Sequence, residues 1–172
     1  MPYSLPDMTD NPAPSLWSGL HRYRFRSRWE LSAPGRCVYQ VQADPRSCPV
    51  WWPEIREVRQ LGEHSGVMRF RSVLPHELAV VVGEARRDPV AGVLEARLDG
   101  DLEGLTRWTV TARGPARATA VFDEDVVVRK PLMRIRGLPG RPALRASHAL
   151  MMRHGRAGLA PYLSVRNIGL DQ

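Results

Sequence analysis

The segment SHALMMRHGRAGL, residues 147–159, decides the fold because it lies within the longest helix that the sequence predicts. Successive residues of an α-helix are about 100° apart, so residues at helical spacing share one stripe. The apolar pattern predicts an amphipathic helix of about 20 residues with one buried stripe. That stripe contains Leu144, His148, Met151, Met152, Gly155, Leu159 and Tyr162.

Upstream of this helix the chain alternates between apolar and charged residues, which is typical of half-buried strands. The first strand is YRFRSRWEL, residues 23–31, with Trp29 on its inner face. A short helix follows, with Pro34 as its first helical residue. Next comes a one-turn helix or tight loop that carries Trp51 and Trp52. Six more strands are predicted at 54–62, 67–74, 78–88, 93–98, 102–112 and 119–130.

A single antiparallel sheet needs a cover for its apolar face, and only the last helix is long enough to provide one. The sequence therefore predicts an α+β helix-grip fold. In this fold a curved antiparallel sheet of about seven strands surrounds a long C-terminal helix, and two short helices follow the first strand. We expect a flexible tail at 1–20, one domain at 21–165 and a C-terminal tail at 166–172.

The composition is that of a globular protein, with 43% hydrophobic and 25% charged residues. The net charge is +7, but Lys130 is the only lysine and many of the arginines stand singly, so we expect no nucleic-acid partner. No apolar run spans a bilayer and no signal-peptide pattern begins the chain, which favours a cytoplasmic protein without stable membrane insertion. Cys37 and Cys48 fit no metal or redox spacing and are expected to be free thiols.

Two inward-facing polar residues are the main candidates for a site. His148 and His154 lie about 120° apart on the helix, so they cannot bind one metal. His148 lies in the apolar stripe and is either a satisfied core histidine or a cavity-facing acid/base group. Glu124 shares strand parity with Phe122 and Val126, and it either faces inward or is turned outward by a bulge.

Several segments in this order resemble the SRPBCC superfamily of START-like helix-grip proteins, and in particular its bacterial members labelled polyketide cyclase/dehydrase. These segments are YRFRSRWELSAPGRCVYQVQADP, WWPEI, GDLEGLTRW, VVVRKPLMRI and SHALMMRHGRAGL. The resemblance covers residues 21–163 and implies an elongated apolar cavity between the sheet and the long helix. Glu124 and Ser147 depart from the family, where an aromatic residue and an asparagine are common at these positions.

Two functions are consistent with this fold and these candidate residues, and the sequence does not decide between them. The first is binding of a small hydrophobic or amphipathic ligand, such as a lipid, a polyketide or an isoprenoid-like molecule. The second is a cyclase/dehydrase-type reaction in which Glu124 and His148 exchange protons. No cofactor and no metal are expected, and a homodimer is left open. The expected ligand-binding residues are Trp29, Phe70, Trp108, Phe122, Met151, Met152 and Tyr162.

A third and less favoured role is an interaction module with a basic outer face. The arginines that would form this face are Arg24, Arg26, Arg28, Arg69 and Arg71. Strong salt-dependent binding to polyanions would support that role.

Overall fold

A computed structural model describes residues 21–71, 77–130 and 140–170. Its seven strands form one antiparallel sheet in the order β1-β7-β6-β5-β4-β3-β2. The strands are β1 (Arg22–Leu31), β2 (Ile55–Gly62), β3 (Ser65–Arg71), β4 (Glu77–Asp88), β5 (Val93–Gly100), β6 (Leu102–Ala112) and β7 (Ala118–Val128). The helical elements are α1 (Gly35–Gln42), η2 (Pro45–Ser47), α2 (Cys48–Trp51) and α4 (Gly140–Leu170).

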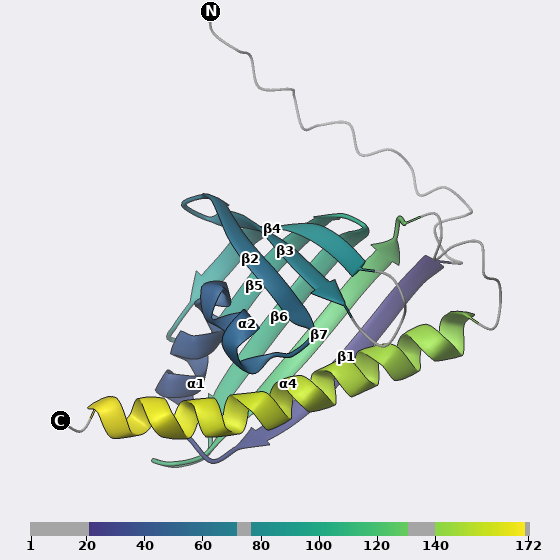
Figure 1. Cartoon of the computed structure of the whole chain (residues 1–172). Coiled ribbons are helices and arrows are strands. Elements are labelled where there is room, and N and C mark those ends of the chain that lie inside the picture. The colour runs from purple at the N-terminus through teal and green to yellow at the C-terminus, as the bar shows by residue number, and fades with distance from the viewer. Residues whose placement is uncertain (1–20, 72–76, 131–139, 171–172) are drawn as a thin grey trace, which may run out of the picture.

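The sheet is strongly curved, and α4 runs across its concave side (Figure 1). Strands β2 to β7 follow one another as neighbours, and β1 completes the sheet by pairing with β7. The short helices α1 and α2 also contact α4. The apolar side of the sheet is therefore covered by helices, which confirms the predicted α+β helix-grip arrangement.

The predicted strands and helices are confirmed, with small differences at their ends. Pro34 is the N-cap of α1 and not its first helical residue. The long helix has 31 residues, more than the 20 or so expected, and it continues past Pro161 to Leu170. The buried stripe ends at Leu163 while the helix goes on with exposed residues, so apolar periodicity underestimates its length. The N-terminal tail, residues 72–74 of the predicted third strand and residues 171–172 lie outside the described residues.

The strand at 78–88 is apolar on both faces, so its parity cannot be assigned from the sequence. In β4, Leu78 and Val80 are buried, whereas Val81 is 40% exposed. Even-numbered residues at the start of this strand therefore face α4. Their inward direction adds a row of aliphatic side chains to the concave face.

Two glycines let α4 approach the segment around α2. A Cβ atom at Gly155 would lie 2.6 Å from the ring of Trp52, and one at Gly158 would collide with the carbonyl oxygen of Trp51. The Trp52 indole also donates a hydrogen bond to the carbonyl oxygen of Met151, at 3.0 Å. The absence of side chains at these two positions therefore allows α4 to pack closely on the α2 segment.

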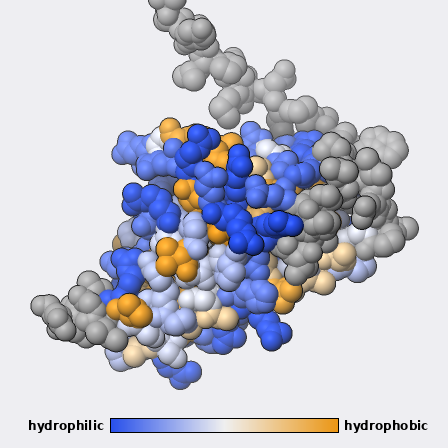
Figure 2. All heavy atoms as spheres, in the orientation of Figure 1, coloured by the Kyte–Doolittle hydropathy of each residue, from blue (hydrophilic) through white to orange (hydrophobic). Residues whose placement is uncertain are grey.

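Several arginines on the outer face of the sheet form ion pairs with acidic side chains. Arg22 and Arg24 both pair with Asp125, and Arg26 pairs with Asp123. The hydrogen bond from Arg22 is the main reason that the pKa of Asp125 lies below its usual value. Figure 2 shows a mostly hydrophilic surface with separate hydrophobic patches on the face it presents. Arg28 pairs with Glu30, and Arg69 contacts Glu57 and Glu77, so four of the five arginines proposed for a basic face have acidic partners.

Candidate functional site

A cavity of about 230 Å³ lies between the concave face of the sheet and the first half of α4. Its wall is built mainly from aliphatic and aromatic side chains. Those from the sheet are Tyr23, Phe25, Ile55, Met68, Phe70, Leu78, Val80, Val82, Leu98, Leu102, Trp108, Phe122, Val126 and Val128. Trp52, Leu144 and Met151 complete the apolar wall, and the polar lining residues are Gln42, Cys48, Thr106, Glu124, Ser147 and His148.

Glu124 faces this cavity because β7 keeps a regular alternation. Its side chain shares the inner face with Phe122 and Val126, which are both buried. The register pairs Glu124 with Phe25 on β1 and with Thr106 on β6. The regular register leaves no bulge that would turn the carboxylate outward.

His148 meets Glu124 from the opposite wall of the cavity. Its Nε2 atom lies 2.9 Å from Oε2 of Glu124, and the two side chains are only 12% and 9% exposed. The imidazole stacks on Phe25, with ring centroids 3.8 Å apart and planes 10° apart. The carboxylate oxygen is close to Nε2 but does not make an aligned hydrogen bond with it. The pair is therefore a buried contact between two titratable side chains that line one apolar cavity.

This arrangement differs from a fully satisfied structural pair. A buried donor or acceptor normally finds a well-aligned partner, because leaving it without one costs stability. Here, Nε2 of His148 has no aligned hydrogen-bond partner among the described residues. The imidazole is held in place by stacking on Phe25, and its Nε2 atom lies beside the Glu124 carboxylate without an aligned hydrogen bond to it.

The structure brings some of the expected ligand-binding residues to the cavity and leaves others in the core. Phe70, Trp108, Phe122 and Met151 line the cavity. Three others do not, and these are Trp29, Met152 and Tyr162.

Each of these three side chains lies outside the cavity for a simple geometric reason. Trp29 packs edge-on against Trp52 and Trp108 in the core beside the cavity. Met152 is one residue, or about 100°, further around the helix than Met151, and it is 2% exposed in the core. Tyr162 packs against the core further along α4 than Met151, the last α4 residue in the cavity wall.

Sequence reasoning missed several lining residues. Tyr23, Phe25 and Leu98 line the cavity but are not among the ligand-binding residues expected from the sequence. Gln42 was missed because the apolar spacing in α1 indicates Cys37, Val38 and Val41 as its buried residues. No periodic signal in the sequence marks a polar residue at the end of a short helix as a cavity residue.

Cys48 lines the cavity but is poorly suited to be a nucleophile. Burial raises the pKa of its thiol to about 12, with a smaller contribution from the charge of Asp44. The thiolate is the reactive form of cysteine, so this thiol stays neutral and unreactive near pH 7. Both Cys48 and Cys37 are free and buried, in agreement with the expectation of free thiols.

His154 has a different partner from His148. Its Nδ1 atom lies 2.5 Å from Oε1 of Glu54, whose side chain is only 10% exposed. The His154 side chain lies on the outer side of α4 and is 44% exposed, and Glu54 reaches it from the loop before β2. The contact ties that loop to the helix. Among the described residues, no group of three or more His, Cys, Asp or Glu side chains is placed to hold a metal ion.

None of the helices in the described ranges is long and apolar enough to cross a membrane. Arg145, Arg153 and Arg156 of α4 are exposed, whereas Ser147 and His148 of the same helix line the cavity. The helix therefore matches its position over a sheet, with one side packed and the other facing outward.

Comparison with known proteins identifies the fold, and the structures that share it have low sequence identity to this chain. No family model and no curated protein matches the chain. Among solved structures, the Zhui aromatase/cyclase from Streptomyces sp. R1128 is 17% identical, with a TM-score of 0.70 over 85% of this chain and 96% of that one. A START superfamily protein from Mycobacterium smegmatis is 14% identical, with a TM-score of 0.67 over 82% and 97% of the two chains.

Norcoclaurine synthase from Thalictrum flavum is 10% identical, with a TM-score of 0.60 over 85% of this chain and 96% of that one. These identities are low, so the matches establish the fold and leave the ligand and the chemistry to the residues of this chain. All of these matches span nearly the whole of the other chain. The protein therefore shares the helix-grip fold of these aromatase/cyclase and START superfamily structures.

Proposed function

We propose that the protein binds a small, largely apolar molecule in the cavity beneath α4. The observation that supports this most strongly is the cavity itself, whose wall is apolar except for a few polar groups at defined places. Ligand sites are typically concave and apolar, with a small number of polar groups that orient the ligand. A volume of about 230 Å³ suits a molecule of one or two rings or a medium-length chain better than a large lipid.

Calorimetric titration with 1-naphthol, a two-ring molecule with one hydroxyl group, tests this proposal. We expect saturable binding at one site per chain, with a negative heat-capacity change because apolar surface is buried. Fluorescence of the lining residues Trp52 and Trp108 should change over the same concentration range. Heats that do not saturate, together with unchanged fluorescence, would contradict a ligand-binding cavity.

A second candidate function is acid–base catalysis on the bound molecule, and the Glu124–His148 contact favours it. In the reaction we propose, the Glu124 carboxylate removes a proton from a carbon next to a carbonyl group. The resulting enolate carbon attacks a second carbonyl carbon of the same molecule and forms the new C–C bond, while protonated His148 gives its proton to the alkoxide oxygen that results. The proton on Glu124 then returns to His148 across their contact. An aldol-type ring closure needs these proton transfers in a site with little water. The aromatase/cyclase title of one structural neighbour is consistent with this class of reaction.

Proton exchange on a simple ketone tests the catalytic candidate without knowledge of the natural substrate. We expect the protein to accelerate deuterium exchange beside the carbonyl of 2-tetralone, measured by NMR. Glu124→Gln and His148→Gln should each reduce that acceleration roughly 100-fold. Asp125→Asn changes a neighbouring carboxylate on the outer face and should leave the rate unchanged. Equal rates for all four proteins would exclude the catalytic candidate and leave simple binding.

A further inference from the structure

A second hollow of about 540 Å³ adjoins the cavity at the end away from α4. It lies between the end of α1 and strands β2 to β5, and we call it the vestibule. Gln42, Met68 and Val82 line both spaces, so these side chains form the wall or neck between them. Many other residues around the vestibule are exposed, which shows that this space opens to solvent.

Two buried polar atoms of α1 face this space without a protein partner. The hydroxyl oxygen of Tyr39 and Nε2 of Gln42 have no hydrogen-bond partner among the described residues. The two residues are three positions apart and so lie on one side of the helix. Both line the vestibule, and Gln42 also lines the cavity. Buried groups of this kind cost stability unless something else satisfies them, which points to a bound molecule.

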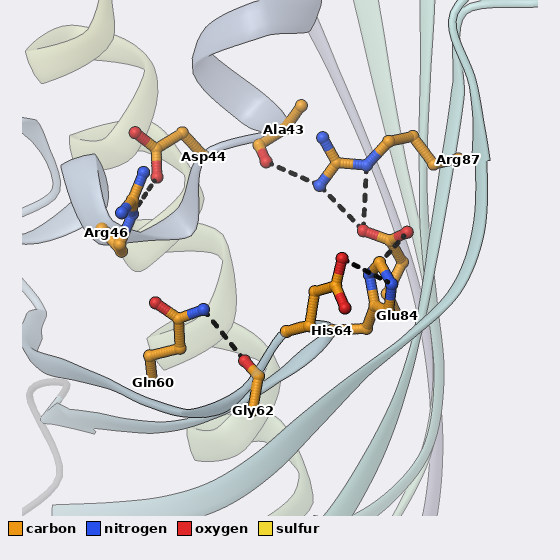
Figure 3. A network of polar contacts seen from close by, with 9 residues as sticks. Ala43, Asp44, Arg46, Gln60, Gly62, His64, Glu84 and Arg87 are labelled. Atoms are coloured by element: carbon orange, nitrogen blue, oxygen red, sulfur yellow. Dashed lines mark hydrogen bonds and ion pairs between the residues drawn. The ribbon is translucent and has the colours of Figure 1, made fainter.

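The charges around the vestibule already satisfy one another. Arg87 contacts Glu84 at 2.8 Å and donates a hydrogen bond to the carbonyl oxygen of Ala43 at 3.1 Å. Arg46 donates to Asp44 at 2.9 Å. Figure 3 shows both arginines engaged in this network, with His64 beside Glu84. The bond from Arg87 to Ala43 also joins β4 to the residue that follows Gln42, which fixes the end of α1.

We infer that the vestibule is a second compartment of the binding site, which holds the neutral, oxygen-bearing end of an amphipathic ligand through Tyr39 and Gln42. This inference rests on the proposed function, because the apolar body of the same ligand occupies the cavity. Carbonyl and hydroxyl oxygens suit this end, since Gln42 donates hydrogen bonds and Tyr39 both donates and accepts. A carboxylate or phosphate would find no free cation among the described residues that line the vestibule, because Arg46, Arg86 and Arg87 are all paired.

The two pairs of polar residues then contact different parts of one ligand. Tyr39 and Gln42 orient the oxygenated end, and Glu124 and His148 contact the part inside the cavity. Burial raises the pKa of the Tyr39 hydroxyl, so this group stays a neutral hydrogen-bonding group near pH 7. The ligand class that fits is an elongated, uncharged molecule with an apolar body and a carbonyl or hydroxyl group at its outer end.

Titration of 1-decanol and naphthalene into three single variants tests this inference. Tyr39→Phe and Gln42→Leu should each weaken 1-decanol binding roughly three- to tenfold, the value of one hydrogen bond. Naphthalene lacks an oxygen atom and is short, so Tyr39→Phe should leave its affinity unchanged, and Gln42→Leu, which makes the shared wall more apolar, should not weaken it. Tyr162→Phe is the matched control, because Tyr162 lines neither space, and it should behave as the wild type.

Thermal unfolding distinguishes a binding role from a structural one. Tyr39→Phe and Gln42→Leu remove polar atoms that lack protein partners, so we expect melting temperatures equal to or above that of the wild type. Unchanged 1-decanol affinity in both variants, with naphthalene still bound, would overturn the vestibule assignment and leave the proposed function intact. If the wild type binds neither probe, the proposed function and this inference both fail.

Discussion

Replacing Gly158 by alanine is expected to lower the free energy of unfolding by about 3 kcal/mol, the upper range for forcing an extra methyl group into a packed core. A Cβ atom at this position collides with the carbonyl oxygen of Trp51, which is a backbone atom and cannot turn aside. Relief therefore requires α4 to move away from α2. Chemical denaturation followed by circular dichroism measures the loss directly.

Gly140→Ala provides the matched control, because it adds the same methyl group to the first residue of α4, where no atom of the described residues lies within 4 Å of the new Cβ. Alanine has a higher helix propensity than glycine, so this variant should be neutral or slightly more stable. A loss of similar size in both variants would mean that the close contact at Gly158 is not the cause. Equal stability of Gly158→Ala and the wild type would contradict the observed packing of α4 on α2.

Replacing Leu98 by tryptophan is expected to weaken 1-naphthol binding at least roughly 100-fold, which corresponds to about 3 kcal/mol. Leu98 lies on β5, and its side chain lines the cavity, so the larger indole occupies space that the ligand needs. The cavity gives the new ring room, so the chain should still fold. Calorimetric titration gives the affinity, and thermal unfolding checks the fold.

The control for this change is Leu105→Trp. Leu105 lies on the neighbouring strand β6, but it points to the outer face and is 49% exposed. The same substitution there should leave 1-naphthol affinity within about twofold, because it neither fills the cavity nor moves its wall. If Leu98→Trp also binds 1-naphthol normally, the ligand binds somewhere other than in this cavity.

The fold was predictable because its signals are local and repeated. Alternation in β1 and β7, and helical spacing from Leu144 to Tyr162, assign the inner faces without tertiary information. For Glu124 the sequence left two directions open, inward or turned outward by a bulge, and the regular register of β7 and the contact with His148 show that it faces inward. A long helix and a single sheet leave few ways to bury both apolar surfaces.

The details of the site depend on long-range packing, which the sequence does not reveal. His154 and Glu54 are 100 positions apart, and no pattern connects them before the chain folds. Trp29 and Phe25 share strand parity, yet only Phe25 reaches the cavity, because Trp52 and Trp108 enclose Trp29. Tyr39 and Gln42 carry no apolar signal, and only the three-dimensional structure shows their polar atoms to be buried without partners.

Photoaffinity labelling with a diazirine-bearing naphthalene, mapped by tandem mass spectrometry, tests the central claim most directly. The cavity account predicts labels on lining residues such as Met68, Ser147 and Met151, and the loss of those labels in Leu98→Trp. Labels confined to exposed apolar residues such as Val50 and Val90, and undiminished in Leu98→Trp, would contradict the claim that this protein holds its ligand beneath α4.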